Sequence, residues 1–424
     1  MIKRVNVRII ESPKEFTKFL RTEDRKKIIS LAKKIEGKRI VHLNATAEGG
    51  GVAEILKSVI PYLRSLGIQA EWYALDSSKI PKRFFVLADK IRYASQGMEM
   101  QMSKDDWDFY KKVSRSFADK FRGVYYDVLV VHDWQPIFMT DYLENKKPRI
   151  LFYHADTSTP YEPVWKEIVR VMEKYKYILF NNKDFTNGSL PKKKVKLFHG
   201  AIDPLLLKQK IVPKKEARCY LQPFGISPDG LLIVQVSRFD VWKNPLGVID
   251  AFKIVQKKHP ETQLALAGIE EATDNPAAEG AFKEVEAAAK GVPNIHLFFR
   301  KGNIQSIEEF TMMLQNAADI VIQNSIREGF GLTVSEAMWK AKPVIGGPAS
   351  GIRLQIQNGK DGLIAKSSKE LANHIMFLLS HPKERKEMGK RAKETVRKKF
   401  LTPSLVCDHL KLYQKVLLKE KRKP

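Results

Sequence analysis

The chain of 424 residues contains little cysteine and no long apolar run. Its two cysteines, Cys219 and Cys407, are too few for a disulfide framework or a cysteine-based zinc site. No apolar run approaches the ~18 residues that a membrane-spanning helix needs. The first residues, MIKRVNVRIIESPKEF, lack the apolar segment of a secretory signal peptide. These absences predict a protein of the reducing cytoplasm.

Acidic residues are outnumbered by basic ones, 48 to 74, which gives a formal net charge of +26. A basic chain suggests an anionic partner, such as nucleic acid, a membrane surface or a phosphorylated substrate. Residues 382–424 carry 15 basic and 5 acidic side chains, so a membrane-binding patch there stays an open alternative. The sequence contains no recognised nucleic-acid-binding module. We therefore expect no nucleic-acid partner, and we interpret most of the charge as solvated surface.

Short β-branched runs alternate with longer amphipathic stretches, a pattern typical of βαβ units and parallel sheets. We predict strands at 39–44, 70–75, 127–133, 149–156, 177–182, 231–239, 262–268, 294–299, 319–325 and 343–347. Predicted helices lie at 51–67, 244–258, 277–290, 306–317, 332–340, 367–379 and 383–398.

A segment rich in proline and glycine, residues 203–230, indicates a linker or long loop between two domains. The predicted fold is therefore α/β, with two doubly wound, Rossmann-like domains that face each other. We expect the first at 1–205 and the second at 206–394, with a C-terminal helix at 395–424 that packs back on the first.

Ligands of doubly wound sheets bind beyond the carboxyl ends of the strands, so the residues after each strand are the candidates for a site. In the first half, three glycines that include Gly50 and Gly51 follow strand 39–44 and precede a helix. They would let backbone N–H groups approach an anion, although a tight turn would also explain them. Strand 127–131 is followed by His132, Asp133 and Trp134, and strand 149–153 by His154.

The two histidines follow neighbouring predicted strands, so their side chains should converge at one edge of the sheet. They could donate hydrogen bonds to a sugar or phosphate, or act as a general base. Their spacing does not predict a metal site, because no pair at i, i+4 and no third ligand accompanies them.

In the second half, Arg238 closes a strand and Lys243 opens the next helix. Two cations at this spacing can hold a diphosphate from two sides. Further along, a strand ends at Ser325, and Glu328 then precedes a Gly-x-Gly turn that opens a helix. The amides of the first helical residues would point at a phosphate. The candidate residues of this segment are Glu328, Gly331, Leu332, Thr333 and Glu336.

The spacing Glu328 to Glu336 is the E-x7-E pattern, and with it the chain resembles the retaining GT-B glycosyltransferases of glycosyltransferase family 4. Within that family it is most similar to the archaeal trehalose glycosyltransferring synthases. The shared strings are VHxNxTxxGGGVAEIL near 41–56, VHDxQP at 131–136, VSRFDxWK at 236–243 and SIREGFGLTVxEAMWKxKPVIG at 325–346. The chain departs from the family at 346–352, which reads GGPASGI, and segment 76–106 has little match. Both departures leave the identity of the acceptor open.

The resemblance implies that a nucleoside-diphosphate glucose is held mainly by the second domain. Arg238 and Lys243 would bind the diphosphate, Glu336 the ribose, Glu328 the donor hexose, and the amides of Leu332 and Thr333, after Gly331, a phosphate. From the first domain, Gly50 and Gly51 would lie under the diphosphate and His154 beside the donor sugar. His132, Asp133 and Trp134 would be candidates for the acceptor pocket. The implied catalytic set is Arg238, Lys243, Glu328 and His154.

The implied reaction is the reversible transfer of glucose, with retention of configuration, from a nucleoside-diphosphate glucose, such as ADP-glucose or UDP-glucose, to glucose, which forms trehalose. The chain contains no Asp-x-Asp metal motif, so we expect no metal and no other cofactor. Three alternatives stay open: a family 4 hexosyltransferase with another sugar, small-molecule or lipid acceptor, a sugar-nucleotide epimerase of the same fold, and a nucleic-acid-binding protein. A homodimer would also be compatible with the sequence.

Overall fold

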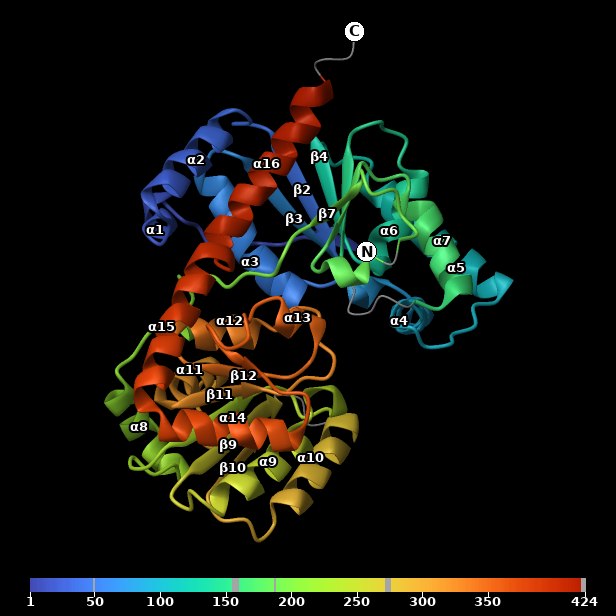
Figure 1. Ribbon diagram of the computed structural model, residues 1–424. Coiled ribbons are helices and arrows are strands. Elements are labelled where there is room, and N and C mark those ends of the chain that lie inside the picture. Colours follow the sequence, from blue (N-terminus) through green and yellow to red (C-terminus); the bar gives the residue numbers. More distant parts are fainter. Residues whose placement is uncertain (49, 155–159, 187, 271–275, 421–424) are drawn as a thin grey trace. The chain divides into compact units, whose positions relative to one another are not determined.

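The computed structural model describes residues 1–48, 50–154, 160–186, 188–270 and 276–420 (Figure 1). The chain divides into two compact units, one of Met1–Ala201 with the segment from Thr402 onward, and one of Ile202–Leu401. The boundary expected at 205/206 lies a few residues after this division. The helix expected to begin at 395 is two helices, α15 (Pro382–Lys399) and α16 (Thr402–Glu420), and only α16 belongs to the first unit.

The first unit is built on a seven-stranded sheet in the order β1-β3-β2-β4-β5-β6-β7. Its strands are β1 (Ile2–Arg4), β2 (Arg39–Asn44), β3 (Gln69–Leu75), β4 (Val128–His132), β5 (Arg149–Tyr153), β6 (Tyr177–Phe180) and β7 (Val195–Leu197). All residues of β4 and β6 are buried, as parallel strands covered on both faces should be. The edge strand β1 pairs antiparallel with β3, which corrects the expectation of a purely parallel sheet.

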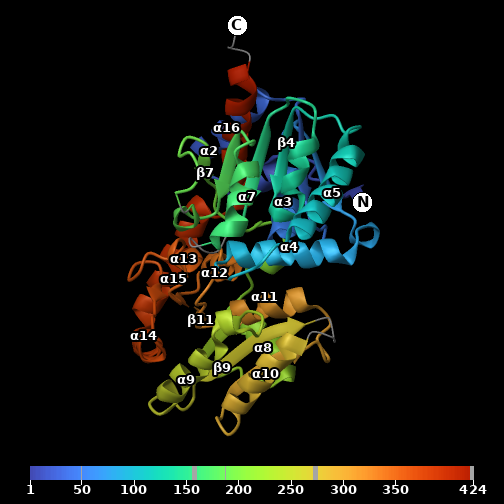
Figure 2. The same cartoon turned by 90° about the vertical axis from the view of Figure 1, so that its right-hand side faces the viewer.

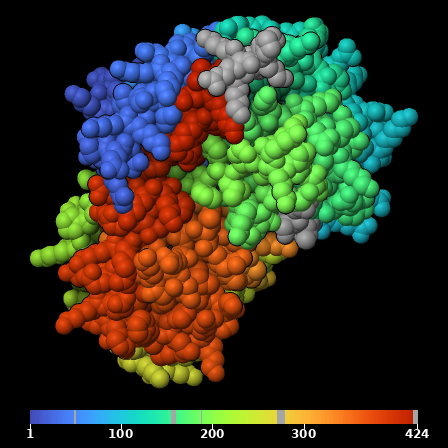
Figure 3. All heavy atoms as spheres, turned by 45° about the horizontal axis from the view of Figure 1, so that its top comes forward, coloured from blue at the N-terminus to red at the C-terminus, as the bar shows by residue number. Residues whose placement is uncertain are grey.

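Helices cover both faces of this sheet (Figures 1 and 2). One face carries α1 (Lys14–Thr17), α2 (Thr22–Lys33), α3 (Gly50–Ser65) and α16, and the other carries α4 (Lys82–Ser95), α5 (Lys104–Phe121), α6 (Trp134–Ile137) and α7 (Glu162–Met172). Helix α16 packs against α2 and α3. Figure 3 shows this red C-terminal helix lying between blue and green parts of the same unit.

The second unit has a six-stranded sheet, and each of its described strand pairs is parallel, in the order β10-β9-β8-β11-β12-β13. Its strands are β8 (Leu232–Val236), β9 (Gln263–Glu270), β10 (Ile295–Arg300), β11 (Ile320–Gln323), β12 (Val344–Gly346) and β13 (Leu363–Ile364). The helices are α8 (Lys214–Leu221), α9 (Pro245–Gln256), α10 (Pro276–Ala289), α11 (Ile307–Ala317), α12 (Leu332–Trp339), α13 (Ser350–Arg353), α14 (Ser368–Ser380) and α15.

Segment 203–230 is not the loop that its prolines indicated. It contains α8 and two short 3₁₀ turns at Leu207–Gln209 and Gln222–Phe224. Pro213 is the N-cap of α8, and Pro223 lies in the turn after it. Proline is compatible with a helix start because the first N–H groups of a helix have no intrahelical partner. The prediction of a linker or long loop was therefore wrong for the half of this segment that these elements cover.

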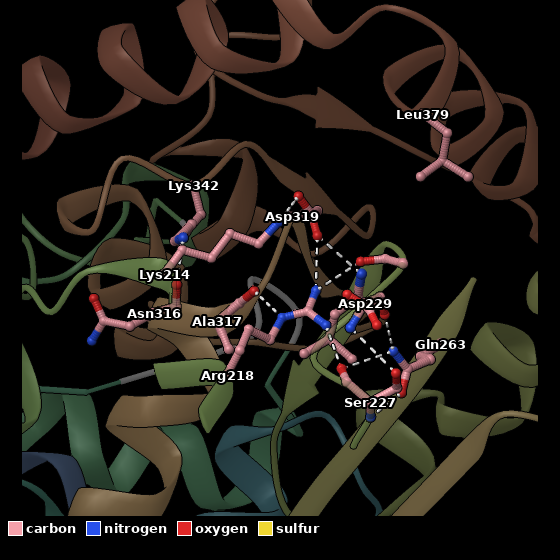
Figure 4. A network of polar contacts seen from close by, with 12 residues as sticks. Lys214, Arg218, Ser227, Asp229, Gln263, Asn316, Ala317, Asp319, Lys342 and Leu379 are labelled. Carbon is pink, nitrogen blue, oxygen red and sulfur yellow. Dashed lines mark hydrogen bonds and ion pairs between the residues drawn. The ribbon is translucent and has the colours of Figure 1, made fainter. Parts of the chain in front are cut away.

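Helix α8 is fixed to the sheet by a buried carboxylate, Asp319, which precedes β11 (Figure 4). Its Oδ2 accepts hydrogen bonds from Arg218 Nη2 and from the backbone N of Leu232, both at 3.0 Å. Its Oδ1 lies 2.6 Å from Lys214 Nζ. Arg218 also donates to the carbonyls of Ala317 and Ser227. This network lies at the amino ends of β8 and β11.

Candidate functional site

In both units the order of the strands reverses direction at one point, and most of the sequence-predicted residues follow the strands on either side of it. In the first sheet this point lies between β2 and β4, and in the second between β8 and β11. The crevice at such a reversal, beyond the carboxyl ends of the strands, is where doubly wound sheets bind ligands. Gly50 follows β2, Asp133 follows β4, Lys243 follows β8, and Glu328 follows β11.

Lys243 and Glu328 are brought together at the reversal in the second unit. Lys243 Nζ contacts Glu328 Oε2, and each side chain is 16% exposed. Asp240 fixes the turn that presents Lys243, because its Oδ1 accepts from the backbone N of Trp242 and of Lys243. The result is a half-buried ion pair at the junction of two strands.

Gln235, on β8, ties the two sides of this junction together. Its Nε2 donates to the carbonyl of Lys243 at 3.1 Å, and its Oε1 accepts from the backbone N of Asn324 at 3.1 Å. A neutral glutamine inside a strand carries no motif in sequence, so it escaped sequence analysis. We conclude that Gln235 sets the register between the Lys243 turn and the Glu328 loop.

Arg238, the other predicted cation, does not join this pair. Its side chain is 76% exposed and lies 3.6 Å from Asp240 Oδ2. Ion pairs this exposed contribute little energy, so the guanidinium is free to change its rotamer at small cost. The structure therefore places one predicted cation in a half-buried pair and the other in solvent.

Helix α12 opens directly behind Glu328. Gly331, at its N-cap, has φ +83°, and a Cβ on it would lie 3.0 Å from Glu328 Cγ. Glycine adopts this backbone conformation without steric cost. The N–H groups of Leu332 and Thr333 are among the first of the helix, which have no intrahelical acceptors and carry partial positive charge. A phosphate near this helix end would be bound by both.

Glu336, one turn into α12, is only 8% exposed. Its Oε1 accepts from Gln209 Nε2 and lies near Lys208 Nζ, both at 3.2 Å. Lys340, on the next turn, donates to the carbonyl of Lys208 at 2.7 Å, and burial lowers the pKa of Lys340 to about 8. Lys208 and Gln209 were missed by sequence analysis, because they lie in the segment expected to be a linker or long loop.

The loop after β12 closes against the Glu328 loop without room for side chains. A Cβ on Gly347 would lie 2.5 Å from the carbonyl oxygen of Ser325, and one on Gly351 would lie 2.6 Å from that of Glu328. Gln355 Nε2 donates to the carbonyls of Phe330 and Gly331. The unusual GGPASGI segment therefore supports the backbone around Glu328.

In the first unit, His132 ends β4 and His154 follows the neighbouring strand β5, and their rings stack with centroids 5.8 Å apart. This convergence was predicted. The rings of Phe152 and His154 stack at 4.4 Å between centroids and 4° between planes. His154 Nδ1 lies 2.8 Å from Asp133 Oδ1, and the backbone N of His154 donates to the same oxygen at 2.9 Å. Asp133 and His154 therefore form a bonded pair.

His132 itself faces the interior. It is 2% exposed, and its Nε2 lies 3.0 Å from His42 Nδ1. His42 Nε2 in turn lies 3.0 Å from the hydroxyl of Tyr413 on α16, which also lies 3.0 Å from His409 Nδ1. Burial, together with the neighbouring histidines, lowers the pKa of His132 and of His42 well below the ordinary value, and burial alone lowers that of His409 to about 3.

The remaining predicted residues of the first unit lie around the same edge. Trp134 opens α6 and is half-buried, and its ring meets Tyr153 edge to face at 6.0 Å. Gly50 and Gly51 begin α3, and a Cβ on Gly51 would meet nothing within 4 Å. Gly49, the first glycine of the predicted turn, and residues 155–159, which follow His154, lie outside the described residues.

Over the described ranges, no three His, Cys, Asp or Glu side chains gather in a way that could hold a metal ion. The helices of that part of the chain are also too short or too polar to span a bilayer. What the arrangement offers chemically is a half-buried cation and carboxylate beside a helix N-terminus in one unit, and a histidine bonded to a carboxylate in the other.

Comparison with known proteins gives matches over most of the chain. The family described as "Trehalose synthase, N-terminal domain" matches residues 42–187, and "Glycosyl transferases group 1" matches residues 220–395. A trehalose synthase from Pyrococcus horikoshii is 34% identical over 404 residues, which cover 95% of each chain. One from Rubrobacter xylanophilus is 36% identical over 408 residues, or 95% of this chain and 96% of that protein.

Solved structures share the fold at low sequence identity. An Anabaena protein crystallised in complex with UDP and glucose matches with a TM-score of 0.64 and a sequence identity of 14%, over 89% of this chain and 100% of that one. Together with the two sheets described above, this likeness shows that both units have the arrangement of the GT-B fold.

Proposed function

The chain belongs to the trehalose synthase family of glycosyltransferases, and we propose that it is a retaining glucosyltransferase that forms trehalose from a nucleoside-diphosphate glucose and glucose. As a member of this family it is a hexosyltransferase of the GT-B fold. The proposal concerns the donor, the acceptor, the stereochemistry and the residues that carry the reaction.

The observation that supports the proposal most is the position of Lys243, Glu328 and the N-terminus of α12 at one strand junction. A nucleotide sugar offers a diphosphate, a ribose and a hexose in a fixed order. Lys243 and the amides of Leu332 and Thr333 suit the diphosphate, Glu328 suits hexose hydroxyls, and the buried Glu336 suits a ribose diol. The Anabaena protein of similar fold was crystallised with UDP and glucose, which favours a donor of this kind.

The reaction requires stabilisation of separating charge. As the anomeric C–O bond breaks, positive charge develops on the sugar ring and negative charge on the leaving diphosphate. Lys243, Arg238 and the helix N-terminus would stabilise the leaving group without reorganising during the step. The acceptor hydroxyl would attack the anomeric carbon from the face of the sugar ring that the diphosphate leaves. An oxygen of the leaving phosphate would accept the proton of this hydroxyl. Retention then needs no enzymic nucleophile, and the cations take the place of a divalent metal ion.

The test is a product assay on the purified chain. ADP-, UDP- and GDP-glucose are each incubated with and without glucose, with and without EDTA, and products are identified by NMR. We expect glucose-dependent release of nucleoside diphosphate, an α,α-1,1-linked disaccharide and no effect of EDTA. Trehalose supplied with the nucleoside diphosphate should regenerate nucleoside-diphosphate glucose if transfer is reversible.

Other outcomes separate the parts of the proposal. Release only with another acceptor would reject trehalose formation. Conversion of the donor without acceptor would point to an epimerase, and loss of activity in EDTA would reject a metal-independent reaction. Unchanged turnover in Arg238→Ala would show that this exposed side chain does not bind the diphosphate.

A further inference from the structure

Asp133 has a backbone conformation that is almost restricted to glycine. Its φ is +65° and its ψ is −172°, in a region where an L side chain costs on the order of 1–3 kcal/mol. Strain of this kind persists only where the surrounding structure imposes it. The backbone N of Asp133 is held by a hydrogen bond to the carbonyl of Phe152 at 2.9 Å. The strained residue therefore lies directly after β4, and a backbone hydrogen bond fixes it to β5.

The strained conformation directs the carboxylate at His154. One oxygen, Oδ1, accepts from the backbone N of His154 at 2.9 Å and lies 2.8 Å from its ring Nδ1. An ionised carboxylate can only accept hydrogen bonds, so the ring nitrogen that faces it must carry a proton. In a neutral imidazole the other nitrogen, Nε2, then presents its lone pair.

The ring of His154 is also fixed in its plane. Phe152, which is buried, stacks against it at 4.4 Å with an angle of 4° between the planes. The His154 side chain nevertheless stays 20% exposed. Two constraints, one on the plane and one on the tautomer, thus hold an accessible imidazole in a single orientation.

We propose that Asp133 is a positioning residue that acts through His154, and that it holds His154 as the Nδ1–H tautomer so that Nε2 accepts a hydrogen bond from a hydroxyl of the substrate sugar. This inference rests on the proposed function. It differs from the expectation that Asp133 itself belongs to the acceptor pocket, because its Oδ1 is already used twice by His154. Glycine would fit the backbone at position 133 without strain, but it has no carboxylate that could hold His154.

The test uses two variants that differ only in strain. Asp133→Gly removes the carboxylate and relieves the backbone, whereas Asp133→Ala removes the carboxylate and keeps the strain. We expect both to lower kcat by about 10²-fold, since a misplaced catalytic group costs on this order. Asp133→Gly should be the more stable of the two in urea unfolding. Asp119→Ala, which removes an exposed carboxylate on α5, is the matched control and should leave kcat unchanged.

The tautomer gives a readout that a purely structural role would not move. In protein labelled with ¹⁵N-histidine, the signals of His154, assigned by their loss in His154→Gln, should show Nδ1 protonated and Nε2 bare. In Asp133→Gly the proton should move to Nε2 in a large share of molecules. An unchanged Nδ1–H signal would overturn the proposal.

A double variant distinguishes positioning from direct contact with substrate. If Asp133 acts only through His154, then Asp133→Gly combined with His154→Gln should be no slower than His154→Gln alone. Losses that multiply would show that Asp133 acts independently. If the chain transfers no sugar at all, the proposed function fails, but the tautomer in the NMR spectrum still decides whether Asp133 orients His154.

Discussion

The ammonium of Lys243 contacts the carboxylate of Glu328, although the two residues are 85 positions apart in the chain. They follow β8 and β11, which are adjacent in the sheet although β9 and β10 separate them in sequence. The reversal of strand order therefore creates the pair. A half-buried lysine held by a carboxylate keeps its charge in a fixed place, which is what stabilisation of a leaving diphosphate requires.

Removal of this charge should impair turnover more than folding. We expect Lys243→Ala to lower kcat by about 10²- to 10³-fold, the usual cost of losing one preorganised group that stabilises developing negative charge. Steady-state rates of nucleoside-diphosphate release measure this. Lys253→Ala, on the exposed side of α9, is the control and should keep full activity. A rate for Lys243→Ala within threefold of the parent chain would contradict the assignment.

Gly51 provides a prediction in which stability and activity separate. A methyl group there would meet nothing within 4 Å, and alanine is a better helix former than glycine. Gly51→Ala should therefore leave the free energy of unfolding within about 0.5 kcal/mol of the parent value, or raise it. If the donor diphosphate lies against the start of α3, the same methyl group should raise the KM for the donor at least tenfold.

The control for this experiment is Gly280→Ala in α10, where a Cβ also meets nothing within 4 Å. It should change neither KM nor kcat. An unaltered donor KM in Gly51→Ala would show that the glycines after β2 serve only the turn, which is the alternative that the sequence leaves open.

Much of the fold follows from local sequence, because buried parallel strands and amphipathic helices have distinct periodicities. The predicted strand 39–44 coincides with β2, and the predicted helices at 306–317 and 332–340 lie within a residue of α11 and α12. The short strands β1, β7 and β13 were missed, since two or three residues show no periodicity. Helix α8 was missed because the prolines that flank it are signals of both loops and helix starts.

Part of the candidate site, like part of the fold, could be predicted from the sequence. Charged and glycine residues directly after strands are visible in sequence, and His132, His154, Lys243 and Glu328 do lie at carboxyl ends of strands. Neutral side chains that hold them are not visible, because their role depends on pairing across the sheet. Gln235 and Gln355 are of this kind, and so is Tyr413, which reaches His42 from a helix 371 residues away.

The Asp319 network predicts a large effect on stability. Asp319→Ala would leave Arg218, which is 2% exposed, without its carboxylate, and breaking a buried ion pair costs about 3–5 kcal/mol. Urea unfolding followed by circular dichroism measures this loss, and Asp250→Ala on the exposed side of α9 is the control. The double variant Arg218→Met with Asp319→Leu should lose less free energy of unfolding than the single variants Arg218→Met and Asp319→Leu lose together. Additive losses would show that the two charges do not stabilise each other.

The buried histidines of the first unit should make the chain sensitive to mild acid. The pKa of His42, His132 and His409 is lowered in the folded chain, to about 3 for His409, chiefly because burial disfavours the charged ring. In the unfolded chain a histidine titrates near 6.5. Below that pH the unfolded chain binds protons that the folded chain excludes, so the free energy of unfolding falls as pH falls. Each histidine contributes a slope of up to about 1.4 kcal/mol per pH unit.

Urea unfolding at pH 7 and pH 5 tests this prediction. His409→Asn keeps a polar atom near the position of Nδ1 and removes one titrating group, so it should lose less stability between the two pH values than the parent chain does. The two losses should differ by nearly the contribution of one histidine to the free energy of unfolding, which is about 2 kcal/mol between pH 7 and pH 5. His381→Asn, at an exposed position, is the control and should follow the parent chain. An equal loss in the parent chain and in His409→Asn would mean that His409 is protonated in the folded state, which its burial between Tyr413 and Phe198 opposes.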